Sequence, residues 1–238
     1  RAGLGASESM RSKLAEYNDP RLSRAFITKQ GTSGKEQAPG TADNAVYAPN
    51  GTPEQGTSKY GTSLFMYSIS APTLLLSYHE LKFLEAEALC RLERDAKSAL
   101  KDAVVAGLLN AENSFTISRK ELGKTLINAA SSITEAEAES YFDNTIEAKY
   151  TAEPLKTTMT QKYFALWGAS GEATESYNDV RRMKGLGENF IELKNPNSFP
   201  LRCPYGNSDT TTNAEVKAAY GNGQYVYSEN VWWAGGSR

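Results

Sequence analysis

Apolar residues recur at every third or fourth position from about residue 78 to residue 184, and this helical periodicity is the pattern that most restricts the fold. Four helix starts stand out within this stretch. Three are capping boxes and one is a first-turn proline: Ser77-x-x-Glu80, Ser118-x-x-Glu121, Thr134-x-x-Glu137 and Pro154. We therefore predict a mainly α-helical fold.

The apolar positions group into helices of ordinary length. A short helix around Met10–Tyr17 is ended by Pro20. The other expected helices cover residues 78–94, 95–111, 118–130, 134–150, 155–167 and 172–184, and the helix at 155–167 is closed by Gly168. Residues 78–94 and 95–111 are expected to form a helical hairpin. Helical pairs are thus expected across residues 78–184, although a 34-residue repeat consensus does not recur cleanly.

Two loop-rich segments flank the helices. Residues 28–71 are dominated by Gly, Thr, Ser, Pro, Asn and Gln, and a loop of this length is usually functional or disordered. Residues 185–238 show no sustained period and are expected to be loop-rich, with short strands such as QYVYS at 224–228.

Charge and composition exclude several classes of protein. There are 26 Lys+Arg against 28 Asp+Glu, so the chain is not a basic nucleic-acid binder. A membrane span needs about 20 apolar residues, and the best run, PTLLL at 72–76, is broken at once. The chain begins at Arg1 and shows no targeting segment, so we interpret it as a processed or truncated piece.

Candidate catalytic and metal-binding residues are few, and we expect no catalytic residue, no metal site and no cofactor. The single histidine, His79, excludes mechanisms that need two imidazoles, and its place at the start of a helix suggests a half-exposed cap-region residue. Cys90 and Cys203 form no C-x-x-C motif, and Cys90 is expected to be a free, buried thiol. Whether the two cysteines meet, and whether a structural metal ion is held, are left open by the sequence.

The remaining polar motifs have structural explanations. Residues two apart on a helix face different ways, so Glu85-Glu87 and Glu135-Glu137-Glu139 are interpreted as solvated helix faces. The segment Gly168–Gly171 lacks G-x-S-x-G spacing and is expected to join two helices. Arg181 and Arg182 are expected at the C-terminal end of a helix, where positive charge interacts favourably with the helix dipole.

Aromatic residues are the more informative set. Tyr47, Tyr60 and Tyr67 lie in the polar 28–71 segment, where flat rings with polar edges suit a sugar ring or a peptide. The alternative is that each ring packs down and anchors its loop. Trp232-Trp233 is expected to pin the tail to the body.

Four segments together resemble one protein family. They are NDPRL at 18–22, PTLLLSYHELKFLEAEAL at 72–89, TQKYFALWGASGEATESYNDVRRMKG at 160–185 and VWW at 231–233. In this order they are similar to the C-terminal half of the SusD/RagB-like outer-membrane lipoproteins of Bacteroidetes. Residues 172–179 lack the tryptophan-rich version of the motif. The resemblance implies a mainly α, tetratricopeptide-like repeat scaffold with long loop-rich excursions, and that residues 1–238 are the C-terminal portion of a single domain.

The resemblance also implies a function. It implies a non-enzymatic nutrient-binding protein that caps a SusC-like TonB-dependent transporter and hands over glycans or oligopeptides. It further implies location at the cell surface on the outer membrane, through a lipid anchor that this chain lacks. The motif residues Leu81, Phe83, Leu84, Trp167 and Trp233 would pack the scaffold. Ligand binding is assigned to Tyr47, Tyr60 and Tyr67 on loop chemistry alone.

Two other functions stay open at this point. One is a glycoside hydrolase, which needs two carboxylates at a fixed separation. The other is a helical-repeat module that binds only protein. Ligand cleavage would identify the first, and binding to protein without any small ligand would identify the second.

Overall fold

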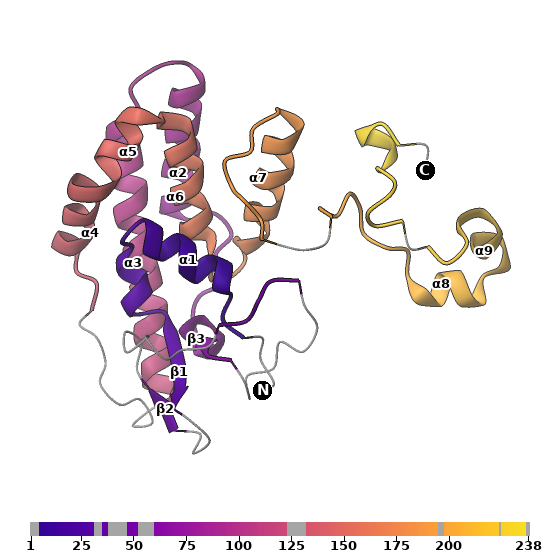
Figure 1. Ribbon diagram of the computed structural model, residues 1–238, viewed down its shortest axis with the longest axis horizontal. Helices are drawn as coiled ribbons and strands as arrows, with labels where there is room; N and C mark the ends of the chain where they lie inside the picture. Colours follow the sequence, from indigo (N-terminus) through magenta and orange to yellow (C-terminus); the bar gives the residue numbers. More distant parts are fainter. Residues whose placement is uncertain are drawn as a thin grey trace. The chain divides into compact units, whose positions relative to one another are not determined.

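The computed structural model describes residues 5–30, 35–37, 47–51, 60–122, 132–194, 198–223 and 225–236. The chain divides into two compact units, residues 1–193 and 194–238, both drawn in Figure 1. The first unit is mainly helical, and the second has short helices joined by turns. No helix in these described ranges is long and apolar enough to cross a membrane.

The predicted helical hairpin consists of α2 (Tyr78–Arg91) and α3 (Lys97–Leu122), which lie side by side. α2 ends earlier than expected, and α3 is far longer. The expected capping box at Ser118 is wrong because this residue lies inside α3. Its buried hydroxyl donates to the carbonyl oxygens of Ser114 (2.8 Å) and Leu64 (2.7 Å), so it fastens a neighbouring segment instead of starting a helix.

In the described part of the first unit, five further helical elements follow α3 in the chain. They are α4 (Glu135–Tyr141), a π-helical turn (Phe142–Ile146), α5 (Glu147–Ala152), α6 (Pro154–Leu166) and α7 (Ala173–Gly185). The capping box at Thr134 is confirmed: its hydroxyl accepts from the Glu137 amide (3.2 Å) while the Glu137 carboxylate accepts from the Thr134 amide (2.8 Å). The first-turn position of Pro154 is confirmed as well.

The junction between α6 and α7 is confirmed at Gly168–Gly171. Gly168 and Gly171 have φ of 78° and 93°, which glycine adopts without strain. A Cβ at Gly168 would overlap the ring of Phe65, and one at Gly171 would overlap the carbonyl oxygen of Leu74. The junction is therefore packed closely against the segment that leads into α2.

The N-terminal part of the first unit combines one helix and a small sheet. α1 (Glu8–Glu16) begins after Ser7, whose hydroxyl accepts from the Met10 amide. The antiparallel sheet has the order β2-β1-β3, formed by β1 (Phe26–Gln30), β2 (Lys35–Gln37) and β3 (Thr62–Ser63). Phe26 pairs with Ser63, and Thr28 with Gln37. The described part of the predicted loop 28–71 thus contains short strands and a 3-10 helix, Leu64–Tyr67.

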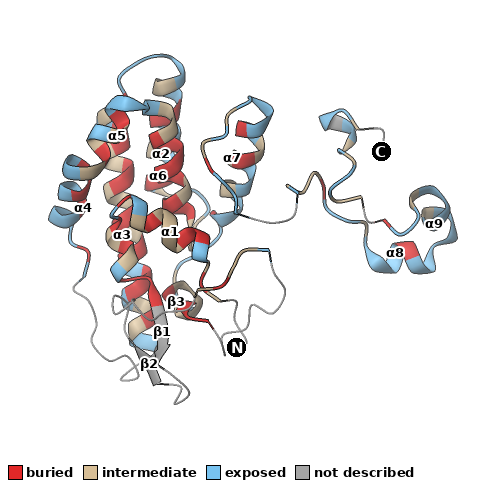
Figure 2. Ribbon diagram, in the orientation of Figure 1, coloured by how far each residue is buried: buried red, intermediate tan, exposed pale blue. Residues whose placement is uncertain are grey.

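The core lies around α3, and Figure 2 shows buried residues on the inner sides of the helices. Phe83 is fully buried, as predicted, but Leu81 and Leu84 are 50% and 42% exposed, so their expected place in the core is wrong. The helical period was right, but these leucines face away from α3. Trp167 is half-buried, with its ring 5.0 Å from that of Phe65.

The second unit contains α8 (Asn207–Thr212), α9 (Ala214–Tyr220) and a short 3-10 helix (Trp232–Ala234). Tyr205 stacks on Tyr220 at 4.4 Å between ring centroids. The strand expected at QYVYS is wrong for its described residues 225–228, which form a turn. The side chain of Trp233 and residue Gln224 lie outside the described set, so anchoring of the tail by the Trp232-Trp233 pair stays a prediction.

Candidate functional site

The three tyrosines assigned to ligand binding all pack against the first unit. Tyr60 is buried, and a Cβ on Gly5 would lie 2.8 Å from its Cβ. Tyr47 is half-buried and meets the ring of Phe26 edge-on at 5.3 Å between centroids. Tyr67 is half-buried against the core. These contacts agree with the alternative that each ring packs down and anchors its segment. The role of the three tyrosines in ligand binding stays a prediction.

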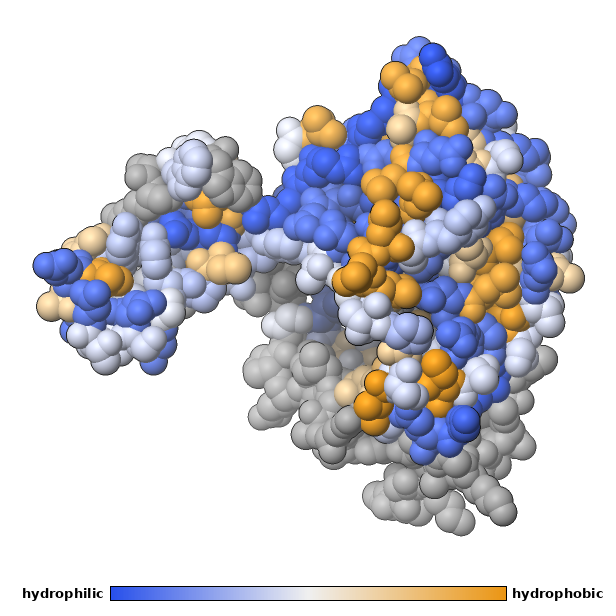
Figure 3. All heavy atoms as spheres, turned by 180° about the vertical axis from the view of Figure 1, so that it is seen from behind, coloured by the Kyte–Doolittle hydropathy of each residue, from blue (hydrophilic) through white to orange (hydrophobic). Residues whose placement is uncertain are grey.

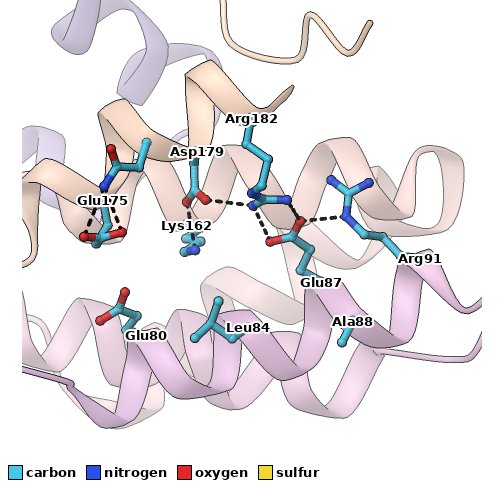
Figure 4. A pocket seen from close by; sticks show the side chains of 10 residues that line it. Glu80, Leu84, Glu87, Ala88, Arg91, Lys162, Glu175, Asp179 and Arg182 are labelled. Atoms are coloured by element: carbon cyan, nitrogen blue, oxygen red, sulfur yellow. Dashed lines mark hydrogen bonds and ion pairs between the residues drawn. The ribbon is translucent and has the colours of Figure 1, made fainter. Parts of the chain in front are cut away.

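A groove with a volume of about 500 Å³ lies between α2 and α7, with α6 at its base. Figure 4 shows Glu80, Leu84 and Glu87 of α2 pointing toward α7, from which Glu175, Asp179 and Arg182 point back. Sequence reasoning did not find this groove. Its lining residues are Glu80, Leu84, Glu87, Ala88, Arg91, Lys162, Glu175, Asn178, Asp179 and Arg182.

Ion pairs fill the middle of the groove. The buried carboxylate of Glu87 accepts hydrogen bonds from Arg91 (Nε–Oε1, 2.7 Å) and from Arg182 (Nη2–Oε2, 2.8 Å). Burial alone would raise the pKa of Glu87, but the hydrogen bonds from Arg182 and Arg91 outweigh it and lower the pKa. Asp179 bridges Arg182 (2.7 Å) and the buried ammonium of Lys162 (2.8 Å). The network joins α2, α6 and α7 through charged groups.

The interpretation of Glu87 as part of a solvated face is therefore wrong, whereas Glu85 is exposed as expected. The spacing of Glu87 and Arg91 is typical of an ion pair within a helix. Its second partner, Arg182, is 95 residues away in sequence, and no local signal could have predicted that contact. Arg182 does lie in the last turn of α7, as expected for the basic end of that helix.

At one end of the groove, the carboxyl group of Glu80 interacts with that of Glu172, which lies behind the lining. Burial, a hydrogen bond with Glu172 and the charge of Glu172 together raise the pKa of Glu80 to about 7. His79 is buried, with Nε2 3.5 Å from Glu172 Oε2, and burial lowers its pKa. The predicted half-exposed histidine is therefore wrong, because Glu172 of the α6–α7 junction covers it.

The predicted capping box at Ser77 is only half formed. The Ser77 hydroxyl accepts from the Glu80 amide (3.1 Å), but the Ser77 amide donates to Glu172 instead of Glu80. Glu172 thus takes the place of Glu80, the third residue of α2, as the acceptor for the Ser77 amide. The Glu80 carboxyl is therefore available to line the groove.

The metal-ligating side chains and the cysteines are the other groups in which the sequence left chemistry open. No group of three or more metal-ligating side chains occurs among them. Cys90 is a free thiol, as predicted, but it is half-buried and not fully buried, and its sulfur lies 3.6 Å from the Thr158 hydroxyl oxygen. Burial raises the pKa of the Cys90 thiol, which disfavours the nucleophilic thiolate. Cys203 is a free, exposed thiol.

Paired helices with appended loop segments define the chain as a helical-repeat scaffold protein. Residues 1–205 match the SusD-like family described as "Starch-binding associating with outer membrane", and the chain belongs to that family. The resemblance and the tetratricopeptide-like, mainly α fold class are therefore confirmed. A search of curated proteins finds no match.

Solved structures place the chain among relatives of about twice its length. A SusD/RagB family protein from Bacteroides thetaiotaomicron is 65% identical, with a TM-score of 0.89, over 100% of this chain and 51% of that chain. A Bacteroides vulgatus outer-membrane protein assigned to nutrient binding is 22% identical (TM-score 0.60; 94% and 50% covered). A SusD homolog from Bacteroides fragilis is 18% identical (TM-score 0.57; 93% and 50% covered). The last two support the fold alone.

Proposed function

We propose that this chain is part of a nutrient-binding protein that captures glycans at the outer membrane and delivers them to a SusC-like TonB-dependent transporter. Oligopeptides are the alternative ligand class. The observation that carries the proposal is the family match across residues 1–205. In the full-length protein, we further propose exposure at the cell surface through a lipid anchor, and no catalytic activity.

The ligand contacts are assigned to the segment that holds Tyr47, Tyr60 and Tyr67. Partly buried tyrosines provide fixed ring faces at low cost in conformational entropy, as sugar recognition requires. The half-buried Tyr47 and Tyr67 can each present an edge or a face to a ligand, whereas Tyr60 would act by holding the segment in place.

The test is calorimetric titration of the chain with linear maltooligosaccharides, chosen from the family description, and with a panel of oligopeptides. Mass spectrometry of each mixture afterwards detects cleavage. We expect saturable binding of one ligand class without products. Tyr67→Ala should weaken that binding about fivefold, since one aromatic ring contact contributes on the order of 1 kcal/mol. Tyr227→Ala, at an exposed tyrosine of the second unit, is the matched control and should leave binding unchanged.

Cleavage products would overturn the proposal in favour of a glycoside hydrolase. Binding of a SusC-like partner without any small ligand would favour a module that recognises protein only. Binding that Tyr47→Phe, Tyr67→Ala and the control affect equally would move the ligand site away from these tyrosines.

A further inference from the structure

Two asparagines of this chain stand directly before a glycine, in Asn50-Gly51 and Asn222-Gly223. An asparagine in this position can lose its side-chain amide without an enzyme, because glycine has no Cβ that hinders attack by its own backbone nitrogen. The reaction consumes water. Hydrophilic side chains cover much of the face of the first unit in Figure 3, and groups on such a surface meet water. Which pair reacts then depends on the contacts of each asparagine and each glycine.

Asn50 is held against the start of α1 by its main chain and by its side chain. The Ala48 amide donates to the carbonyl oxygen of Ala6 at 2.8 Å, which fixes the backbone beside Asn50. Oδ1 of Asn50 accepts from the Ser7 hydroxyl (2.9 Å) and from the Ser9 amide (3.3 Å). Because a backbone amide only donates, the atom that faces α1 is the oxygen of the side-chain amide and not its nitrogen.

These two hydrogen bonds prepare the side-chain amide of Asn50 for attack. A nucleophile that adds to Cγ puts negative charge on Oδ1, and the Ser7 hydroxyl and the Ser9 amide are already in place to stabilise that charge. Preorganised donors of this kind accelerate acyl transfer. The leaving group, Nδ2, donates to no described residue, so no contact has to be broken when it departs.

The nucleophile is the backbone nitrogen of the glycine, and it differs between the two pairs. Gly51 is exposed, and its amide makes no hydrogen bond within the described part of the chain. The Gly223 amide donates to the carbonyl oxygen of Tyr220 at 2.9 Å, and Gly223 is buried. The two glycines have nearly the same backbone angle, with φ of 73° and 70°. The same dipeptide is therefore open to reaction at Gly51 and blocked at Gly223.

We propose that Asn50 is a site of spontaneous deamidation, promoted by the two donors at the start of α1. The Gly51 nitrogen gives up its proton to solvent and bonds to Cγ of Asn50, and Nδ2 takes up a proton and leaves as ammonia. Water then opens the resulting cyclic imide at either of its carbonyl carbons. The products are aspartate and isoaspartate at position 50, and each adds one negative charge to the chain.

The two products should act differently on α1. Aspartate keeps the backbone unchanged and gives the Ser7 and Ser9 donors a charged acceptor, which strengthens the contact. Isoaspartate carries the backbone through the former side chain, so the carboxylate is displaced and this contact is lost. Deamidation would thus divide the protein into molecules whose segment 47–50 is held more tightly on α1 and molecules in which it is released.

The experiment incubates the purified chain at mildly alkaline pH, once folded and once in denaturant. Trypsin releases the two pairs in separate peptides, residues 36–59 and 218–238, and mass spectrometry measures conversion of both in one sample. In the folded chain, Asn50 should convert at least about tenfold faster than Asn222, because the Gly223 amide must first give up its hydrogen bond. In denaturant the two rates should be similar. Isoaspartate at position 50 identifies the cyclic imide, since direct hydrolysis yields aspartate alone.

Ser7→Ala removes one of the two donors and should slow conversion of Asn50 about fivefold. Ser63→Ala is the matched control, because Ser63 also caps a helical turn, through the Phe65 amide at 3.3 Å, and does not contact Asn50. Its effect should stay within about twofold. Far-UV circular dichroism verifies that each variant is folded.

Three results would overturn the proposal: folded-state conversion at Asn50 no faster than at Asn222, a product without isoaspartate, or a rate that Ser7→Ala does not lower below that of Ser63→Ala. No ligand takes part, so the outcome is independent of the proposed glycan binding.

Discussion

α3 and α7 are joined to α2 by different kinds of contact. On the α3 side, Phe83, Leu100 and Leu108 are fully buried in a continuous apolar core. On the α7 side, an ion pair makes the connection between Glu87 of α2 and Arg182 of α7, and Asp179 of α7 is bound in turn to the buried Lys162 of α6. α2 therefore meets α3 through apolar burial and α7 through ion pairing.

The difference explains what each side contributes. Apolar burial is non-directional and supplies most of the folding free energy. Ion pairs contribute less net stability because desolvation offsets their attraction, but their geometry fixes how one helix lies against another. We infer that the α3 side stabilises the unit and the α7 side sets the position of α7. Four predictions, from the largest expected effect to the smallest, test this division.

Removing the ring of Phe83 should give the largest loss of stability. Phe83→Ala leaves a cavity between α2 and α3, and we expect the free energy of unfolding to fall by about 3–5 kcal/mol. Chemical denaturation followed by circular dichroism measures it. Leu81→Ala on the exposed face is the control, and its cost should stay below about 1 kcal/mol. Equal losses for both variants would contradict the assignment of the core.

Neutralising Glu87 should have a smaller effect, concentrated on α7. Glu87→Gln removes the charge that Arg91 and Arg182 share, and because both arginines are partly exposed we expect a loss of about 1–2 kcal/mol. Hydrogen exchange should increase in residues 173–185 and stay nearly constant in α3. Glu85→Gln, at an exposed carboxylate of the same helix, should change neither. Faster exchange in α3 as well would show that the pair supports the whole unit.

Glu80 should make stability depend on pH. Its pKa is raised from 4.5 to about 7 in the folded protein, so between these values the folded state holds a proton that the unfolded state has released. Stability should therefore fall as pH rises through this window, by at most about 1.4 kcal/mol per pH unit. His79, whose pKa is lowered, acts in the opposite direction.

The variant Glu80→Gln isolates this contribution because its amide can still donate a hydrogen bond to Glu172. The difference in unfolding free energy between the variant and the parent chain should grow in favour of the variant from pH 5 to pH 8. A constant difference across that range would show that Glu80 titrates normally.

The surface pair of Lys101 and Asp143 should have the smallest effect. The two groups are 2.7 Å apart, but both are well solvated. Lys101→Ala should leave the unfolding midpoint unchanged within the error of a denaturation curve. A clear shift would mean that charged contacts on this unit are stronger than their exposure indicates.

The helices and their starts could be predicted because the signals are local. Thr134 and Glu137 satisfy each other within one turn, and Pro154 needs no partner. Ser118 has the same spacing to Glu121, yet it lies near the C-terminal end of α3, where its hydroxyl donates to the carbonyl oxygens of Leu64 and Ser114. A capping pattern indicates a helix start only where the chain before it is free to turn.

The groove could not be predicted because its contacts join distant parts of the sequence. Glu87 meets Arg182, and the Ser77 amide meets Glu172, each across 95 residues. Leu81 and Leu84 show a related limit, since periodicity identifies an apolar face but not which neighbour covers it. The periodicity of residues 78–94 predicts that Leu81, Phe83 and Leu84 share one core, whereas only the Phe83 face of α2 belongs to it.

The π-helical turn at Phe142–Ile146 changes the side of the helix that the residues after it face. Tyr141 and Tyr150 are both buried, and the Tyr150 hydroxyl accepts from the Ala96 amide at 2.8 Å. In an uninterrupted α-helix, nine residues make about 2.5 turns, which would leave these two rings on opposite sides. The wider turn delays the rotation and lets both face inward. Deletion of one residue within this turn should therefore restore a regular α-helix and keep the later residues of α5 facing inward, whereas the same deletion within α4 would turn them by about 100°.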